Sequence, residues 1–282
     1  MASSRTCLSR DMGWLENTEL CGSHSLDQTV AENGAVTFSL QKLDSVGSTN
    51  EWVSAHHSTL PSNTLVYTLN QTQGKGRNGR VWASRPGDSV AFSLLVDRLP
   101  DDILPTWVPL LAGVSVVAIV TEIGVTGASL KWPNDVLVEG RKLAGILVEV
   151  LPDSRMVVGV GVNIASTLDS LPHPTATSLA LQGSELTNIE QELLAPIADL
   201  LDSYVQLAKD NSAEYVHSEW QKVVTDHLST LGRAVRWEAD DGSKKRGFAK
   251  HLAGDGGLVV REVSGLEDWV IRSGDVFQIE RS

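Results

Sequence analysis

Seven consecutive residues combine the backbone freedom and the charge that an anion-binding loop needs. The run Gly74-Lys75-Gly76-Arg77-Asn78-Gly79-Arg80 holds three glycines and three cations in a chain whose formal net charge is −12. Glycine lets the backbone approach a ligand closely, and Lys and Arg donate to phosphate or carboxylate oxygens. Like charges this close repel one another, which favours a mobile loop until an anion binds. These residues alone leave a second interpretation open, a solvated basic turn.

The loop departs from the common phosphate-binding patterns. The G-x-G-x-x-G spacing of residues 74–79 fits a dinucleotide fingerprint, but that motif needs a helix after it. Here the following segment ends in Ser89–Val96, which is typical of a strand. A Walker loop needs Lys and then Ser or Thr after the last glycine, where this chain has Arg80. A kinase glycine loop also fits, but no V-A-I-K, H-R-D or D-F-G occurs in the sequence.

A second cation stands beside oxygen ligands in the segment Ser129-Leu-Lys-Trp-Pro-Asn-Asp135. Pro133 disfavours helix at the residue before it, so Lys131 is predicted at a strand end next to a turn. Lys131 with Asn134 and Asp135 supplies a charge and oxygen ligands suited to nucleotide phosphates and Mg²⁺. A surface lysine beside an Asn-Asp turn is the alternative.

Two further elements are predicted to bring polar side chains to their ends. Ser48 with Glu51 forms a capping-box pattern, which predicts a helix from here to about residue 57. Its hydroxyls and amides serve either as a plain cap or as contacts to a polar ligand. The buried strand Thr64–Leu69 delivers Gln71 to its end, where ligands of α/β proteins commonly bind.

The remaining patterns predict the elements that position these residues. A helix begins near Pro105 and carries one apolar face, with Gly113 packed against another backbone. Residues 136–150 form two strands that turn at Gly140, and 156–164 form a third. Glycines at 145, 159 and 161 mark bulges or the close approach of a ligand. A Thr187–Glu190 capping box starts a helix toward residue 209, and a further helix covers 212–227.

Composition and spacing divide the chain of 282 residues into three parts. Residues 1–36 are polar without periodicity and are predicted to be a flexible tail. Residues 37–228 form the main α/β domain. Residues 229–282 contain short strand patterns separated by glycine turns, which indicate a small β-barrel.

Several classes of protein are disfavoured. The net charge of −12 argues against a broad nucleic-acid surface. Cys7 and Cys21, the only cysteines, lack the spacing of a disulfide framework or a zinc site. No apolar run is expected to reach membrane-spanning length, and the N-terminus does not resemble a signal peptide. We therefore expect a cytoplasmic protein.

Taken together, the motifs resemble those of the biotin protein ligases. The resemblance rests on residues 74–80, on Lys-Trp-Pro-Asn-Asp at 131–135 and on Lys-Leu-Ala-Gly-Ile-Leu-Val-Glu at 142–149. Ser-Thr-Asn at 48–50 and Gly-Val-Asn at 161–163 also fit, and the likeness covers roughly residues 37–282. It implies an α/β (α+β) catalytic domain with a mixed sheet of the class II synthetase type, followed by an SH3-like domain.

The resemblance also implies a reaction and its site. Such enzymes join biotin to ATP with Mg²⁺, release pyrophosphate, and pass biotin from biotinyl-5′-AMP to one lysine of a biotin carboxyl carrier domain. Lys131 and Arg77 take the catalytic positions. The positions implied for biotin are Ser48, Thr49, Asn50, Gln71, Lys75, Gly76, Arg77, Lys131 and Gly145. Those implied for the nucleotide are Arg77, Arg80, Trp82, Lys131, Asn134 and Asn163, and Asp135 is the metal position.

The chain departs from the family pattern in two places. Lys75 and Asn78 stand where the family often has arginines, so the loss of a bidentate fork and of one charge predicts weaker retention of the adenylate. Only about 36 polar residues precede the catalytic domain, too few for the winged helix of members that repress transcription. We therefore expect no operator binding.

Two other functions compete with this interpretation. A lipoate or octanoate ligase or transferase resembles the family in fold and in its acceptor lysine. A biotin-responsive regulator without turnover belongs to a different class, and the Lys131 segment argues against it. The sequence leaves open the oligomeric state, the carrier protein, the general base for transfer, the order of substrate binding and the role of the tail.

Overall fold

The computed structural model describes residues 27–29, 38–239, 242–263, 265, 268–272 and 274–279. Its centre is an eight-stranded sheet in the order β1-β2-β3-β6-β10-β9-β8-β7. The strands are β1 Asp27–Thr29, β2 Phe38–Lys42, β3 Thr64–Thr68, β6 Ser89–Val96, β7 Ala128–Lys131, β8 Asp135–Val138, β9 Arg141–Val150 and β10 Met156–Asn163. Only β2 and β3 run parallel among these neighbours, so the predicted mixed sheet is confirmed.

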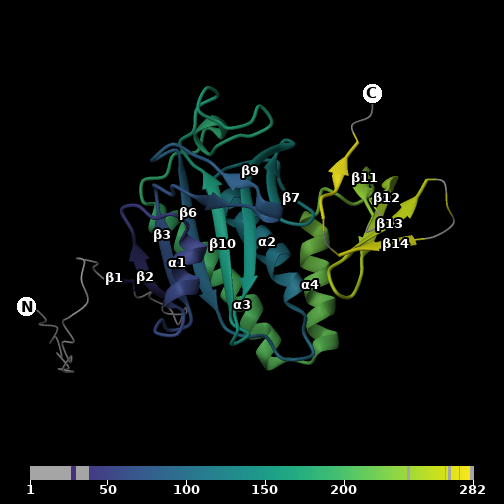
Figure 1. Ribbon diagram of the computed structural model, residues 1–282, viewed down its shortest axis with the longest axis horizontal. Helices are drawn as coiled ribbons and strands as arrows, with labels where there is room; N and C mark the ends of the chain where they lie inside the picture. The colour runs from purple at the N-terminus through teal and green to yellow at the C-terminus, as the bar shows by residue number, and fades with distance from the viewer. Residues whose placement is uncertain are drawn as a thin grey trace, which may run out of the picture.

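Alternation along the central strands gives the sheet two apolar faces. On β3 and β6, Leu65 and Leu94 join the large core, while Val66 and Leu95 join a smaller cluster on the opposite face. The helix α1 Thr49–His56 covers the smaller face through Val53. The helices α2 Val108–Glu122, α3 Ala195–Asp210 and α4 Ala213–His227 cover the larger one. Figure 1 shows α2 to α4 together on one side of the central strands.

The helix α2 differs from its prediction in how much of it is buried. It follows a 3-10 turn at Pro105–Trp107, as expected, but its buried residues lie on nearly every side rather than on one face. A methyl group at Gly113 would meet the side chain of Leu130, not another backbone. The segment Pro105–Glu122 is also long and apolar enough to span a membrane by composition, contrary to expectation, and 67% of that window is buried. Its apolarity is that of a core helix.

Two other helix boundaries refine the sequence interpretation. Ser48 caps α1 as predicted, because its Oγ accepts from the Glu51 backbone N–H at 3.5 Å. The Thr187–Glu190 capping box does not form. Instead, Asn188 Oδ1 accepts from the backbone N–H groups of Glu190 and Gln191. A π-helical stretch, Glu190–Leu194, follows before Pro196 opens α3.

The C-terminal residues form a separate antiparallel sheet of five strands in the order β14-β13-β12-β11-β15. These are β11 Ala234–Glu238, β12 Lys244–Leu252, β13 Leu258–Glu262, β14 Asp268–Ile271 and β15 Phe277–Gln278. Within the part of the chain that is described, β14 and β15 are the two edges of this sheet. The predicted small all-β unit is therefore present, but the described residues of β14 and β15 do not pair to close it into a barrel. Figure 1 shows it beside α4.

The predicted tail is mostly outside the described residues. Within it, Asp27–Thr29 forms β1 and pairs antiparallel with β2. These three residues therefore belong to the edge of the main sheet, a difference from the predicted boundary at residue 36. Three residues have too little pattern to be recognised as a strand from sequence.

Candidate active site

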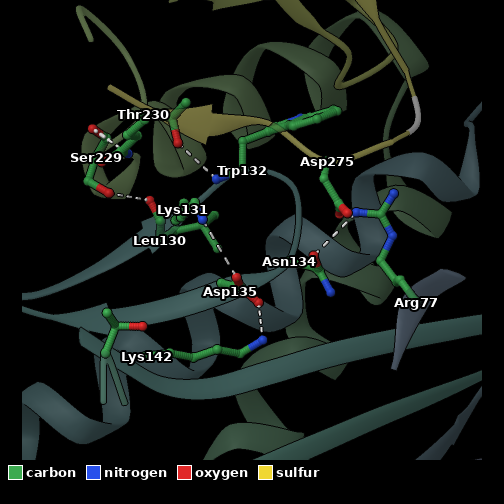
Figure 2. A network of polar contacts seen from close by, with 12 residues as sticks. Arg77, Leu130, Lys131, Trp132, Asn134, Asp135, Lys142, Ser229, Thr230 and Asp275 are labelled. Atoms are coloured by element: carbon green, nitrogen blue, oxygen red, sulfur yellow. Dashed lines mark hydrogen bonds and ion pairs between the residues drawn. The ribbon is translucent and has the colours of Figure 1, made fainter. Parts of the chain in front are cut away.

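A tight turn between β7 and β8 places Lys131 opposite Asp135. The two strands pair with Lys131 facing Asp135, and the peptide bond between Trp132 and Pro133 is cis. The turn is held from behind by the segment that follows α4. The Trp132 backbone N–H donates to Thr230 Oγ1 at 2.9 Å, and Ser229 donates to the carbonyl of Leu130. Figure 2 shows these contacts beside Lys131.

Two lysines neutralise the carboxylate of Asp135. Lys142 Nζ lies 2.5 Å from Asp135 Oδ1, and Lys131 Nζ lies 3.9 Å from Oδ2 (Figure 2). The described residues contain no group of three His, Cys, Asp or Glu side chains that could hold a metal ion. A carboxylate already paired with two cations does not fit a resident Mg²⁺ centre. The prediction of a metal ligand at Asp135 is therefore not supported by its surroundings.

The basic loop forms a short hairpin that lines the pocket. The strands β4 Gly74–Lys75 and β5 Val81–Trp82 pair around a turn at Arg77–Gly79. Asn78 and Gly79 take positive φ, at 55° and 72°. Glycine and asparagine tolerate this conformation better than other residues. The motif thus supplies a turn at residues 78 and 79, while Gly74 allows close contact with the Trp82 backbone.

The three cations of the hairpin have protein partners. Lys75 pairs with Glu51, and this hydrogen bond raises the pKa of Lys75. Arg80 lies 2.5 Å from Asp275 of the C-terminal unit. Arg77 donates to Asn134 Oδ1 and to the carbonyl of Gly274, both at 3.3 Å, and burial lowers its pKa. The hairpin is thus connected to α1, to the Lys131 turn and to the C-terminal unit.

A polar wall is formed where α1 meets the end of β3. Gln71 Oε1 accepts from the Thr49 backbone N–H at 2.9 Å, and Thr49 Oγ1 lies 3.3 Å from the same oxygen. Asn50 donates to the carbonyl of Leu147 and to Glu149. Ser48, Thr49 and Asn50 are all buried. The hydroxyls and amides predicted to contact a polar ligand therefore lie together.

An aromatic ring covers the central strands on the same face of the sheet as Asn50. A methyl group at Gly161 would lie 2.6 Å from Trp82 Cε2, and one at Gly145 would lie 3.1 Å from Trp82 Cζ3. Lys142 Nζ stands 5.6 Å from the centre of the same ring, within cation–π range. The sequence predicted a bulge or the close approach of a ligand at these glycines. The groups that approach them are side chains of the protein itself.

These features enclose one cavity of about 160 Å³. Nearly every predicted site residue lines it: Ser48, Thr49, Asn50, Gln71, Lys75, Gly76, Arg77, Arg80, Trp82, Lys131, Asn134, Asp135 and Gly145. The cavity joins an uncharged polar wall to a cationic end at Lys131 and Lys142. Such a cavity suits a ligand with a neutral polar head and an anionic group.

Asn163 does not line this cavity, contrary to prediction. It is buried, and its Nδ2 donates to the carbonyl of Thr177 at 2.9 Å. Its side chain therefore fixes the segment after β10. The rule that polar residues at strand ends face ligands does not distinguish a ligand contact from a loop anchor.

Sequence reasoning missed two groups in the cavity. Lys142 belongs to the motif at residues 142–149, but it was not predicted as a site residue. Its charge and its place close to Asp135 in the sequence could have identified it as a second cation. Residues 275–277 also line the cavity, from the C-terminal unit. No sequence signal connects them to a loop nearly 200 positions earlier.

Comparisons with known proteins agree with the fold. Residues 42–164 match the model of the "Biotin/lipoate A/B protein ligase family". The biotin--[acetyl-CoA-carboxylase] ligase of Mycobacterium tuberculosis (strain ATCC 25618 / H37Rv) is 33% identical over 227 residues, covering 76% of this chain and 79% of that protein. The chain therefore belongs to the biotin/lipoate A/B protein ligase family.

Two further matches define the extent of the likeness. A structure of biotin protein ligase from Aquifex aeolicus in complex with biotin and ATP superposes with a TM-score of 0.70 at 25% identity, covering 86% of this chain and 99% of that one. The bifunctional ligase/repressor BirA of Bacillus subtilis (strain 168) is 35% identical over 133 residues. That match covers 44% of this chain and 41% of that protein.

Proposed function

We propose that the protein is an ATP-dependent biotin protein ligase that acts on a lysine of a biotin carboxyl carrier domain. The observation that carries the proposal is the composition of the cavity. Its uncharged wall at Thr49 and Gln71 suits the ureido head of biotin, and the lysines at its other end suit a carboxylate and a phosphate. The named relatives and the Aquifex complex with biotin and ATP support these ligands.

In the first step, a carboxylate oxygen of biotin attacks the α-phosphorus of ATP. A P–O bond forms, the bond to the β-phosphate oxygen breaks, and pyrophosphate leaves. Two anions must approach, so the role of Lys131 is to offset their repulsion and the charge that develops on the phosphate. Lys142 pairs with Asp135 at 2.5 Å and so offsets a negative charge that would otherwise repel the entering anions.

In the second step, the neutral amine of the acceptor lysine attacks the acyl carbon of biotinyl-5′-AMP. An amide bond forms, AMP leaves, and the amine loses a proton. The hairpin of residues 74–82 covers the cavity and excludes water from the mixed anhydride before transfer. Arg77 is suited to keep this cover in place, because it connects the hairpin to Asn134 and Gly274.

We infer that Mg²⁺ enters with the triphosphate of ATP, whose oxygens supply ligands that the described side chains do not. When bound there, the ion neutralises phosphate charge. The cytoplasmic location and the absence of operator binding stay predictions.

The test is ATP–pyrophosphate exchange, measured with biotin, with lipoate and with no added acid. Exchange that requires biotin is expected. Exchange with lipoate alone would move the function to a lipoate ligase, and biotin binding without exchange with either acid would favour a regulator without turnover. Transfer is then tested by the mass increase of an isolated carrier domain, with its acceptor lysine replaced by arginine as the control.

A further inference from the structure

Behind the polar wall, a second layer of side chains determines which atoms of the wall face the cavity. Ser93 lies on β6 directly opposite Gly159 of β10 and is fully buried. Its Oγ is 2.8 Å from Thr49 Oγ1 and 2.7 Å from Asn50 Oδ1. Gly159 leaves space for this contact, because a methyl group there would lie 2.0 Å from Asn50 Oδ1.

The direction of each hydrogen bond follows from groups that can only accept. Asn50 faces the Leu147 carbonyl at 3.2 Å and the Glu149 carboxylate at 2.7 Å. A carbonyl and an ionised carboxylate have no proton to donate. The amide nitrogen of Asn50 must therefore point toward them, and its oxygen must point toward Ser93.

This orientation fixes the hydroxyl protons as well. Ser93 has a single hydroxyl proton, and Asn50 Oδ1 can only accept, so Ser93 donates to Asn50. In the 2.8 Å contact between Ser93 and Thr49, the Thr49 hydroxyl must then be the donor. The other neighbour of Thr49 Oγ1, Gln71 Oε1, is also an acceptor. The only proton of the Thr49 hydroxyl is thus taken by an acceptor of the protein, and its lone pairs are left to accept from a ligand.

Gln71 is oriented by the same kind of argument. The Thr49 backbone N–H can only donate, and it holds Gln71 Oε1 at 2.9 Å. The amide nitrogen of Gln71 is left to donate to a ligand. The wall therefore offers one acceptor, Thr49 Oγ1, beside one donor, Gln71 Nε2, the complement of a urea with its N–H and C=O groups.

We propose that Ser93 is a positioning residue for the acid substrate, and that Glu149 acts with it through Asn50. Together they fix the wall in the donor–acceptor pattern that a ureido head requires. This inference rests on the proposed biotin ligase function. In this proposal neither Ser93 nor Glu149 touches the ligand. Ser93 does not line the cavity, and its effect passes through Thr49.

The experiment compares Ser93→Ala with Ser115→Ala in biotin-dependent ATP–pyrophosphate exchange. Ser115 is also fully buried, and its hydroxyl donates to the Leu111 carbonyl within α2, so the control loses one hydroxyl without a link to the cavity. Ser93→Ala should raise the KM for biotin about tenfold, the effect of one lost hydrogen bond. Its KM for ATP and its kcat should stay within twofold of wild type, and Ser115→Ala should change none of the three.

Glu149→Ala provides a second variant on the exposed end of the network. It should raise the KM for biotin as well. The rise in the double variant should be smaller than the product of the two single rises, because Glu149 acts through Asn50 and Ser93. An unchanged KM for biotin in Ser93→Ala would overturn the inference. An equal rise in the KM values for biotin and for ATP would overturn it as well. Absence of biotin-dependent exchange in the wild type would instead overturn the proposed function.

Discussion

Gly161→Ala is the sharpest test of the close contact between Trp82 and the sheet. The added methyl group would lie 2.6, 2.8 and 2.9 Å from three atoms of the indole ring. Carbon atoms pack at about 3.5–4.0 Å, so the ring must move by about 1 Å. Overpacking of this size costs about 1–3 kcal/mol. Trp82 is paired with Gly74 in the hairpin, so its displacement disturbs the cover of the cavity.

The expected result is a loss of kcat/KM for biotin-dependent exchange of about five- to 140-fold, from the conversion of that cost at about 1.4 kcal/mol per factor of ten. Gly161 pairs within the sheet with Ala91 and with Gly145, in strand conformation that alanine also adopts, so the fold should persist. Gly145→Ala is the matched control. Its methyl group meets Trp82 at 3.1 Å and the flexible end of Lys142 at 3.2 Å, so its effect should be smaller.

A comparison of Gly161→Ala in the wild type and in a Trp82→Phe background tests whether overlap with the indole causes the loss. Trp82→Phe replaces the indole by a smaller ring and so removes much of the overlap with the added methyl group. In that background, the additional cost of Gly161→Ala should fall to less than threefold. If Gly161→Ala costs as much in the Trp82→Phe background as it does in the wild type, steric overlap with the indole is not the cause.

The other predictions concern the reaction, the cover and stability. Lys131→Ala should abolish exchange while the thermal midpoint stays within about 2 °C of wild type; near-normal exchange would remove Lys131 from the mechanism. The Arg77→Gly variant should release biotinyl-5′-AMP, which then labels lysines of bystander proteins. Unchanged release would show that the hairpin does not act as a cover. Asp202→Asn should raise the thermal midpoint by about 2 °C at pH 7. Burial raises the pKa of Asp202, so its charged form costs stability as pH rises above about 4, and the gain should vanish near pH 3.

The sheet and helices were accessible from sequence because their patterns are local. The capping box at Ser48, the buried run at 64–69 and the turn at Gly140 each identified an element within one or two residues. Where the prediction was wrong, tertiary contacts determined the helix boundary or the extent of its burial. Asn188 caps the helix that Thr187 was expected to cap, and α2 is enclosed by neighbours that its own sequence does not reveal.

The site was predictable in its residues but not in their partners. The family resemblance assigned Lys131, Gln71 and Trp82 to one site, and all three line the same cavity. The same types did not reveal that Asp135 is held by two lysines, or that Asn163 anchors the loop after β10. Pairing depends on three-dimensional proximity, and a side chain with a protein partner looks the same in sequence as one that awaits a ligand.

The C-terminal unit contributes to the site through its backbone as well as through side chains such as Asp275. Trp132 Nε1 donates to the carbonyl of Gly256, and Trp107 Nε1 donates to that of Gly254, both at 3.1 Å. The first bond holds the turn that bears Lys131, and the carbonyl of Gly274 holds Arg77. Backbone carbonyls are present whatever the side chain, so sequence motifs carry no trace of such contacts. The C-terminal unit therefore fixes both the turn that bears Lys131 and the hairpin that bears Arg77, without contributing a recognisable catalytic residue.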